Sequence, residues 1–301
     1  MTRPGVLDAY ARFERFGAVG STNDIIRDWL AEGVPEVCIA VADEQVAGRG
    51  RNGRAWSAPA GTALLCSIGF RPTWLEPADT WRLAAMVGLA MADAAEDAAG
   101  LGEGTIRFKW PNDFVVIREG SDAVLIGDVT ADEAIEQQSA PLALRKLAGI
   151  LGETDGLGTG DPRAVVGIGI NADWPATAFP PELAGSMTSL REVSGGRPID
   201  REAMLDGFLG RLETRVAALR GGRFDVAGWT ARQVTTGHLV TLSGIDGSTT
   251  TVRAIGVDGA SGALVVQDIH GEDLHRPGGA PERLVFAGEI LRLRLPAAGM
   301  V

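Results

Sequence analysis

Short apolar runs with many β-branched residues recur through the first two thirds of the chain, and amphipathic segments separate them. These runs predict strands at residues 37–42, 62–70, 106–110, 114–117, 147–151 and 164–170. Apolar residues at helical spacing predict a helix of about three turns after Ser21, and longer helices at residues 80–99 and 201–219. Strands interleaved with helices indicate an α+β fold, in which a mixed β-sheet is flanked by helices.

The pattern of the sequence changes at Gly237. From there, short alternating segments at residues 239–242, 249–256, 263–268 and 289–293 are separated by glycine turns, which is typical of a small β-barrel. The stretch from Gly221 to Thr236 is the expected boundary region. We therefore predict two domains, residues 1–235 and residues 236–301.

Composition narrows the class of protein. The chain has 301 residues, of which 45% are hydrophobic, so it can bury a large core. Residues 1–15 lack an apolar run of signal-peptide length, and nowhere do 18 apolar residues follow one another, so we expect a cytoplasmic protein without membrane spans. Cys38 and Cys66 lie in apolar surroundings, which favours reduced buried thiols. The net charge of -11 repels nucleic acid, and we expect no DNA partner.

A loop rich in glycine and arginine lies between two of the expected strands. Gln45 precedes it, Trp56 follows it, and it reads Gly48-Arg49-Gly50-Arg51-Asn52-Gly53-Arg54. Glycine lets the backbone approach a ligand closely, and arginine binds carboxylate or phosphate through paired hydrogen bonds. The alternative is a flexible surface loop that binds nothing. The position of the loop between two buried strands favours an anion-binding role.

Three further segments place polar side chains at the ends of expected elements. Lys109-Trp110-Pro111-Asn112-Asp113 brings a cation, an amide and a carboxylate to one proline turn, enough for a phosphate and its Mg²⁺. Lys146 lies at the start of the strand at 147–151, and Ser21-Thr22-Asn23 lies at the start of a helix. Each has an ordinary explanation as well: a polar turn, a strand-edge charge and a helix cap.

The segment from Val165 to Ala172, VVGIGINA, formally fits the Gly-x-Gly-x-x-Ala dinucleotide pattern. Trp174 and the prolines around it forbid the helix that such a site requires, so we reject a dinucleotide fold. The glycines favour instead a ligand lying close against the sheet, with Asn171 as a hydrogen-bonding end.

Together these segments resemble the biotin–protein ligase family in order, spacing and chemistry. In this sequence they read STN, DEQVAGRGRNGRAW, KWPND, KLAGIL and GIGIN, and the likeness covers nearly the whole chain. The combination of GRGR-x-GR-x-W with KWPND is highly specific. The resemblance implies a class II synthetase-like catalytic domain with a small SH3-like C-terminal barrel. It also implies an enzyme that makes biotinyl-5′-adenylate from biotin and ATP, then passes biotin to a lysine of a biotin carboxyl carrier protein or domain.

The resemblance further implies a role for each matching residue. Ser21, Thr22 and Gln45 would bind the ureido ring of biotin, and the backbone of Gly48, Gly149 and Gly167 would line the pocket, with Asn23 and Gly169 as further binding residues. Arg49 and Arg51 would fold over the adenylate, Trp56 would pack under the closed loop, and Asn171 would contact the nucleotide. Lys146 would hold the carboxylate and α-phosphate oxygens, while Lys109, Asn112, Asp113 and Arg54 would serve the ATP phosphates and Mg²⁺. The expected catalytic residues are Arg51, Lys146, Lys109 and Asp113, with Asp113 as the Mg²⁺ ligand.

Two features depart from the family pattern. About 32 residues separate Asp113 from Lys146, so residues 119–145 are expected to be an inserted surface excursion. Some twenty residues precede Ser21, too few for the helix-turn-helix domain of repressor-ligases, so we expect a ligase that does not regulate transcription. Arg292 and Arg294 are both candidates for the C-terminal arginine that helps bind the nucleotide in some relatives. The acceptor carboxylase and the choice between monomer and homodimer stay open.

Two alternative functions compete with this interpretation. A lipoate–protein ligase shares the fold and the adenylation chemistry, but it lacks the GRGR-x-GR loop. The other alternative is a nonenzymatic relative. A DNA-binding repressor is disfavoured because no N-terminal helix-turn-helix domain is expected, and a pseudo-ligase that only binds biotin or nucleotide is disfavoured because Lys109, Asp113, Arg51 and Lys146 are all present.

Overall fold

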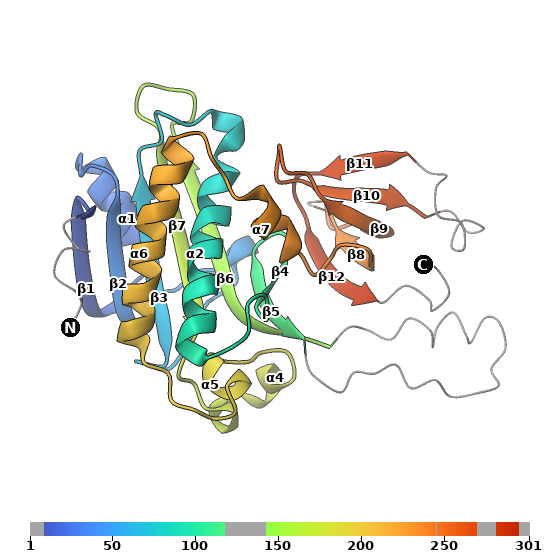
Figure 1. Cartoon of the computed structure of the whole chain (residues 1–301), viewed down its shortest axis with the longest axis horizontal. Coiled ribbons are helices and arrows are strands. Elements are labelled where there is room, and N and C mark those ends of the chain that lie inside the picture. Colours follow the sequence, from blue (N-terminus) through green and yellow to red (C-terminus); the bar gives the residue numbers. More distant parts are fainter. Residues whose placement is uncertain (1–8, 118–142, 245, 270–280, 295–301) are drawn as a thin grey trace.

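The structure is a computed structural model that describes residues 9–117, 143–244, 246–269 and 281–294. A seven-stranded sheet with helices on it lies beside a separate five-stranded antiparallel sheet (Figure 1). This arrangement confirms the predicted mixed sheet with flanking helices and a second, smaller β-structure after it.

The large sheet has the strand order β1-β2-β3-β7-β6-β5-β4. β1 and β2 are parallel, and every other neighbouring pair is antiparallel. The strands are β1 (Arg12–Val19), β2 (Cys38–Gln45), β3 (Ala63–Phe70), β4 (Arg107–Lys109), β5 (Asp113–Ile117), β6 (Leu144–Asp155) and β7 (Arg163–Asn171).

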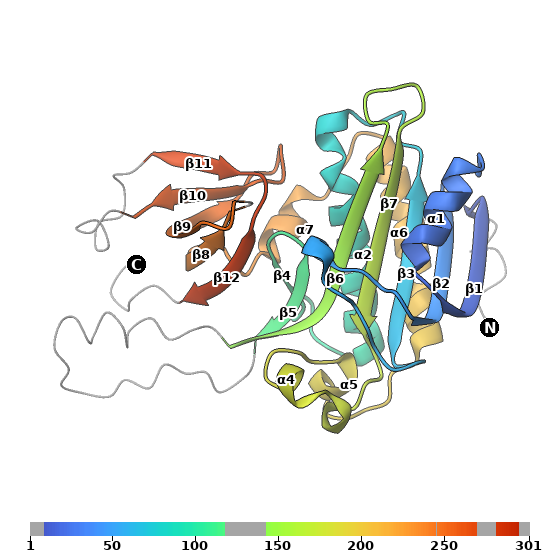
Figure 2. The same ribbon diagram turned by 180° about the vertical axis from the view of Figure 1, so that it is seen from behind.

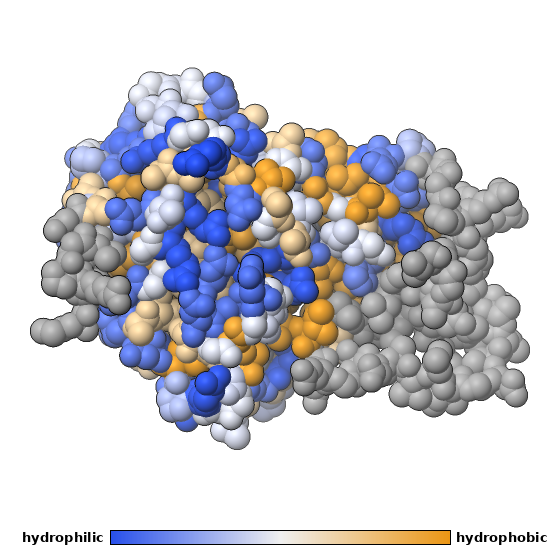
Figure 3. All heavy atoms as spheres, viewed as in Figure 1, coloured by the Kyte–Doolittle hydropathy of each residue, from blue (hydrophilic) through white to orange (hydrophobic). Residues whose placement is uncertain are grey.

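Two long helices, α2 (Trp81–Ala99) and α6 (Arg201–Arg220), pack together over one face of this sheet (Figure 1). Their outward side chains are largely hydrophilic (Figure 3), as expected for helices with one buried face. A shorter helix, α1 (Thr22–Ala31), lies on the opposite face against β2, β3 and β7 (Figure 2). The remaining short helices are α4 (Pro181–Ala184), α5 (Leu190–Val193) and α7 (Val226–Ala231), and 3-10 turns lie at Arg51–Gly53, Pro77–Asp79 and Ala176–Ala178.

The central strands are apolar at successive positions because both of their faces are covered. In β2, Ile39 and Val41 belong to the main core with α2 and α6, whereas Cys38 and Ala40 pack with Ile26 of α1. Alternate side chains of a strand point to opposite faces, so a strand covered on both sides reads as a continuous apolar run. The sequence therefore located these strands well. Both cysteines are buried and unpaired, as predicted.

The C-terminal sheet has the order β11-β10-β9-β8-β12. Its strands are β8 (Leu239–Ser243), β9 (Thr249–Val257), β10 (Leu264–Asp268), β11 (Glu282–Val285) and β12 (Glu289–Arg294). Among the described residues, β11 and β12 lie at opposite edges of this sheet and do not pair with each other. The short, mostly exposed β11 pairs with β10 alone. The closed SH3-like barrel is thus not confirmed, and the domain division at residues 235 and 236 stays a prediction.

The smaller sheet is joined to the larger one next to β4. Phe108 N donates to Arg232 O at 2.7 Å, and Val234 N donates to Phe108 O at 2.9 Å, so the segment after α7 pairs alongside β4. Trp110 Nε1 in turn donates to Gly262 O at 3.2 Å, before β10. These contacts bring the C-terminal sheet to the turn that follows Lys109.

Some elements differ from the sequence-based expectation. β1 was not predicted, because it is an edge strand whose residues are half-buried or exposed and show little apolar alternation. β6 is longer than the expected strand at 147–151, and it includes Leu144 and Arg145 from the expected insertion. Residues 119–142 of that insertion lie outside the described residues. Ile117, before the insertion, pairs with Leu144 near its end. Within the described part of the chain, no helix has the length and apolar character needed to cross a membrane.

Candidate active site

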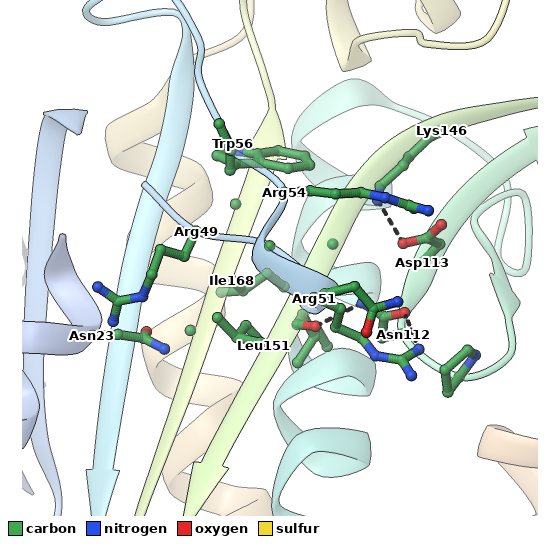
Figure 4. Close-up of a pocket in the computed structure, with 18 of the residues that line it drawn as sticks. Asn23, Arg49, Arg51, Arg54, Trp56, Asn112, Asp113, Lys146, Leu151 and Ile168 are labelled. Atoms are coloured by element: carbon green, nitrogen blue, oxygen red, sulfur yellow. Dashed lines mark hydrogen bonds and ion pairs between the residues drawn. The ribbon is translucent and has the colours of Figure 1, made fainter. Parts of the chain in front are cut away.

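The loop that joins β2 to β3 crosses the face of the large sheet that carries α1 (Figure 2). A cavity lies beneath this loop (Figure 4). Distant parts of the chain line it: the start of α1, the glycine-arginine loop, the turn between β4 and β5, the middle of β6 and β7, and the start of β12. The lining residues predicted from the sequence are Ser21, Thr22, Asn23, Gln45, Arg49, Arg51, Arg54, Trp56, Lys109, Asn112, Asp113, Lys146, Gly149, Gly167 and Gly169. The structure thus brings together nearly all of the predicted site.

Two predicted site residues do not line this cavity. Gly48 lies at the neck of the loop, where Trp56 N donates to Gly48 O at 2.9 Å and a side chain on Gly48 would lie 2.4 Å from Trp56 O. Asn171 is fully buried, and its Nδ2 donates to Thr188 O at 2.9 Å. Its Oδ1 is buried without a hydrogen-bond partner in the described residues. Gly48 therefore shapes the loop, and Asn171 is a buried residue with one unused acceptor, outside the cavity lining.

One end of the cavity is a buried polar network. Gln45 Oε1 accepts hydrogen bonds from the Thr22 backbone N–H at 2.7 Å and from Thr22 Oγ1 at 3.0 Å. Because a backbone N–H can only donate, the amide oxygen of Gln45 must face Thr22. Gln45 Nε2 then has no partner among the described residues and remains a donor at the cavity. This end can therefore offer a ligand a donor from Gln45 and an acceptor oxygen from Thr22.

Asn23 is held from two sides within the same network. Ser67 Oγ donates to Asn23 Oδ1 at 2.6 Å and lies 2.7 Å from Thr22 Oγ1, and Asn23 Nδ2 donates to Glu153 Oε2 at 2.6 Å. Since a carboxylate only accepts, Glu153 fixes which way the Asn23 amide points. Ser67 and Glu153 were not predicted as site residues, although a serine inside the apolar run of β3 is a signal for a buried polar contact.

The capping explanation for Ser21-Thr22-Asn23 is incomplete. Ser21 is the N-cap residue of α1, with extended φ and ψ of -155° and 136°, but its side chain makes no capping hydrogen bond. Thr22 and Asn23, which are buried, direct their side chains to Gln45, Ser67 and Glu153 instead. These polar side chains thus build the site rather than cap the helix.

Glycines make the floor of the cavity. A Cβ on Gly167 would lie 2.1 Å from Asn23 Oδ1, and a Cβ on Gly169 would lie 2.6 Å from Trp56 Nε1. Both glycines lie inside β7, not in a strand-to-helix turn, which agrees with the rejection of a dinucleotide fold. Trp56 Nε1 is buried without a hydrogen-bond partner in the described part of the chain. The two glycines therefore let polar side-chain atoms of Asn23 and Trp56 lie directly against the backbone of β7.

The other end of the cavity gathers cations (Figure 4). Lys146 Nζ lies 2.6 Å from Asp113 Oδ1 and 5.4 Å from the centroid of the Trp56 ring. Arg51 donates from Nη1 to Asn112 Oδ1 at 3.3 Å and from Nη2 to Gly288 O at 3.0 Å. These contacts join the loop, the turn between β4 and β5, and the C-terminal sheet around one space.

Glu289 is a site residue that the sequence did not reveal. It lies at the start of β12 and accepts paired hydrogen bonds from Arg54 at 2.6 and 2.8 Å. These bonds lower the pKa of Glu289, and they raise that of Arg54. Burial of Lys109 lowers the pKa of its ammonium group, while the charges of Asp113 and Glu289 act in the opposite direction. A single carboxylate on a short β-segment carries no local sequence signature of such a role. The side chains of Arg292 and Arg294 lie outside the described part of the structure, so the choice between them stays open.

Comparison with known proteins places this geometry in a family. Residues 17–171 match the model of the biotin/lipoate A/B protein ligase family. The chain belongs to this family. The matched region runs from β1 to the end of β7 and contains both ends of the cavity.

Curated relatives point in the same direction. The chain is 29% identical over 239 residues to the biotin–[acetyl-CoA-carboxylase] ligase of Mycobacterium tuberculosis, covering 78% of this chain and 76% of that protein. It is 29% identical over 197 residues to the bifunctional ligase/repressor BirA of Bacillus subtilis, covering 65% of this chain. That match spans only 51% of the Bacillus protein.

Solved structures share the fold. Biotin protein ligase from Aquifex aeolicus, in complex with biotin and ATP, superposes with a TM-score of 0.67 at 23% identity, covering 94% of this chain and 99% of that one. The Leishmania major ligase in complex with biotinyl-5-AMP gives a TM-score of 0.55 at 18% identity, covering 92% and 99%. At these identities the likeness supports the fold of the family.

Proposed function

We propose that this protein is a biotin–protein ligase, which activates biotin with ATP to biotinyl-5′-adenylate and transfers biotin to a lysine of an acceptor protein. The observation that carries the proposal is the pairing of a buried polar network with a cluster of cations in one cavity. The names of the curated relatives support the same chemistry.

The polar end fits the ureido ring of biotin. That ring has a carbonyl, which needs a donor, and two N–H groups, which need acceptors. Gln45 Nε2 supplies a donor, and the Thr22 hydroxyl supplies an acceptor at the same end. Gly167 lets the Asn23 side chain lie directly against the backbone of β7 at this end of the cavity. A ligand with this ring satisfies polar groups that would otherwise be left unpaired in the cavity.

The alternative substrate, lipoate, fits this end less well. Its dithiolane ring has no N–H or carbonyl to meet Gln45 and Thr22. A site built to hydrogen-bond its substrate can reject an analogue that lacks those groups by about 10⁴-fold or more, because the buried polar groups of the site lose their partners. We therefore place biotin ahead of lipoate.

The cationic end fits the reacting groups. Adenylation brings the biotin carboxylate to the α-phosphorus of ATP and releases pyrophosphate, so negative charge moves between oxygens without a covalent enzyme intermediate. Lys146 and Arg51 would stabilise the carboxylate and α-phosphate oxygens, and Lys109 and Arg54 would hold the outer phosphates. Trp56 and its loop would shield the mixed anhydride from water until the acceptor lysine attacks it.

Asp113 is the carboxylate that would bind Mg²⁺ brought by ATP. No group of three or more acidic, histidine or cysteine side chains converges as a metal site in the described residues. A single carboxylate from Asp113, completed by the phosphates of ATP, is a donor set that fits Mg²⁺, because this ion commonly uses one or two carboxylates together with substrate phosphates. The ion would supply neutralisation of phosphate charge, next to the pair that Asp113 forms with Lys146.

The acceptor that we propose is a biotin carboxyl carrier protein or domain, by analogy with the named ligase of Mycobacterium tuberculosis. Cytoplasmic location and a homodimer stay predictions, as does the absence of a DNA partner. The closed SH3-like form of the C-terminal sheet also belongs to this proposal.

Pyrophosphate exchange tests the proposal. The purified protein with ATP and Mg²⁺ should exchange labelled pyrophosphate into ATP when biotin is added, and lipoate or octanoate should not replace biotin. Exchange with lipoate but not with biotin would assign the chain to the other branch of its family. Biotin binding without exchange would indicate the nonenzymatic alternative.

A further inference from the structure

Arg49 and Arg51 are two residues apart in the loop, but their side chains point to opposite ends of the cavity (Figure 4). Arg51 contacts Asn112 and Gly288 at the cationic end. Arg49 lies at the polar end, where Nη1 and Nη2 donate to the two carboxylate oxygens of Asp24 at 2.7 and 2.8 Å. Its Nη2 also lies 3.7 Å from Glu153 Oε2. The two arginines are therefore not equivalent.

The acidic partners of Arg49 are themselves anchored. Arg27 donates to Asp24 Oδ1 at 2.7 Å and to Glu153 Oε1 at 2.9 Å, so one guanidinium bridges α1 and β6. Glu153 also accepts from Asn23 Nδ2 at 2.6 Å. Two carboxylates and two guanidinium groups thus form a neutral cluster that joins α1, β6 and the loop. We call Arg49, Asp24, Glu153 and Arg27 the clamp.

In the clamp, the positive charge of Arg49 is neutralised by carboxylates of the protein itself. Paired hydrogen bonds between guanidinium and carboxylate are among the stronger polar contacts, and they fix geometry as well as distance. The hydrogen bond from Arg49 lowers the pKa of Asp24, so this carboxyl stays ionised through the neutral range. A ligand anion would have to displace Asp24 before it could use Arg49.

We propose that Arg49 is a positioning residue, which Asp24 and Glu153 hold so that the loop stays closed over the polar end of the cavity. This inference rests on the proposed function as a biotin ligase. The clamp controls how tightly and how long biotin is held, and it leaves the adenylation chemistry to Arg51 and Lys146. It reassigns Arg49 from the adenylate contact implied by the family resemblance, and it gives roles to Asp24 and Glu153.

The competing arrangement makes the opposite prediction. If Arg49 leaves Asp24 to contact the adenylate, then Asp24 competes with the ligand for Arg49. Removing the charge of Asp24 would in that case strengthen ligand binding or speed adenylation. Under the clamp, the same change weakens biotin binding.

The test uses Asp24→Asn, with Asp28→Asn as the matched control. Asp28 is an exposed carboxylate on the same helix, so its replacement removes the same charge outside the clamp. Biotin dissociation constants and release rates are measured by calorimetry and stopped flow, and KM for ATP and kcat by pyrophosphate exchange. We expect Asp24→Asn to weaken biotin binding about three- to tenfold, as for a well-formed but partly exposed ion pair. KM for ATP and kcat should stay within about twofold, and Asp28→Asn should change nothing.

A double variant separates the two roles of Arg49. If Arg49 acts through Asp24, adding Arg49→Gln to Asp24→Asn should weaken biotin binding by no more than about a further twofold, because the interaction is already lost. Arg49→Lys should recover only part of the binding, since lysine lacks the paired fork. If Asp24→Asn folds poorly, Arg49→Gln alone keeps the test available, because Arg49 lies on a loop: the inference requires a larger loss in biotin affinity than in kcat, and the reverse would overturn it.

Three results would overturn the inference: unchanged or tighter biotin binding by Asp24→Asn, additive losses in the double variant, or a fall in kcat with Arg49→Gln in the Asp24→Asn background. These are distinct from a failure of the proposed function. In that failure the unaltered protein would itself show no biotin binding and no biotin-dependent exchange.

Discussion

Gly167→Ala is the substitution whose effect the structure predicts most directly. An added Cβ would lie 2.1 Å from Asn23 Oδ1 and 2.9 Å from Asn23 Cγ, far inside normal contact distance. Asn23 would have to move by more than an ångström. It cannot do so and keep its hydrogen bonds, because Ser67 and Glu153 hold its amide from two sides at 2.6 Å each. The substitution therefore disrupts the hydrogen bonds of Asn23 at the polar end of the cavity.

The magnitude follows from the two bonds that would be lost. Leaving a buried polar group without its partner costs about 1–3 kcal/mol, and the bond to the Glu153 carboxylate is charge-assisted. We expect Gly167→Ala to lower the free energy of unfolding by about 2 kcal/mol, after some relaxation. Biotin binding should weaken about ten- to a hundredfold, since each tenfold change in affinity corresponds to about 1.4 kcal/mol.

The assay compares this variant with Gly152→Ala. Gly152 lies in the neighbouring strand β6, its φ is not positive, and an added Cβ there would meet nothing within 4 Å. Calorimetry gives the biotin dissociation constant of each variant, and urea unfolding gives its stability. Gly152→Ala should bind biotin normally, with stability unchanged or slightly raised. If Gly167→Ala bound biotin as tightly as Gly152→Ala, Asn23 would have no part in the binding site and the argument from its contacts would be refuted.

Three other predictions concern charge and reactivity. Arg51→Ala or Lys146→Ala should cut adenylate formation by at least about a hundredfold while circular dichroism reports an intact fold, and near-normal rates would show that their roles are misplaced. Burial raises the pKa of Cys38 to about 11 and of Cys66 to about 12, so both thiols stay protonated at neutral pH and a thiol reagent should label them only after unfolding. Burial lowers the pKa of Lys109, so as the pH rises this lysine loses its charge at a lower pH than an exposed lysine does. KM for ATP should therefore rise in the alkaline range, and Lys109→Arg, whose charge is permanent, should flatten that rise.

The sequence predicted the central strands of the large sheet, which are covered on both faces, and missed the edge strand β1. Residues 62–70 form a mostly apolar run, interrupted by Ser67, because every residue of β3 is buried. β1, with Arg12, Glu14 and Arg15 along it, lacks that signal, because a partly exposed edge strand tolerates charges at successive positions. Its pairing with β2 depends on the α1 crossover, which composition does not encode.

The site residues also fall into two groups, those that the sequence predicted and those that it did not. Residues that carry the family motifs were predicted and are found together, because the motifs fall at the ends and middles of adjacent strands. Ser67, Glu153 and Glu289 were missed, since each acts through a partner far away in the sequence. Arg49 was predicted as a site residue, but its partner Asp24 became apparent only when α1 and the loop were placed side by side.

Arg51 and Arg54 have different partners within the protein, and this difference decides which of the two gains more from an anionic ligand. Arg54 already pairs with the carboxylate of Glu289, so a phosphate would only replace one anionic partner with another. The gain in binding energy is then the difference between these two interactions. Arg51 donates to neutral oxygens, Asn112 Oδ1 and Gly288 O, so an oxyanion would replace weaker acceptors with a stronger one. Arg51→Ala should therefore reduce kcat/KM for ATP more than Arg54→Ala, by at least about tenfold. Equal losses in pyrophosphate exchange would mean that Glu289 does not offset the charge of Arg54, and that the pairing across the two sheets has no energetic weight in nucleotide binding.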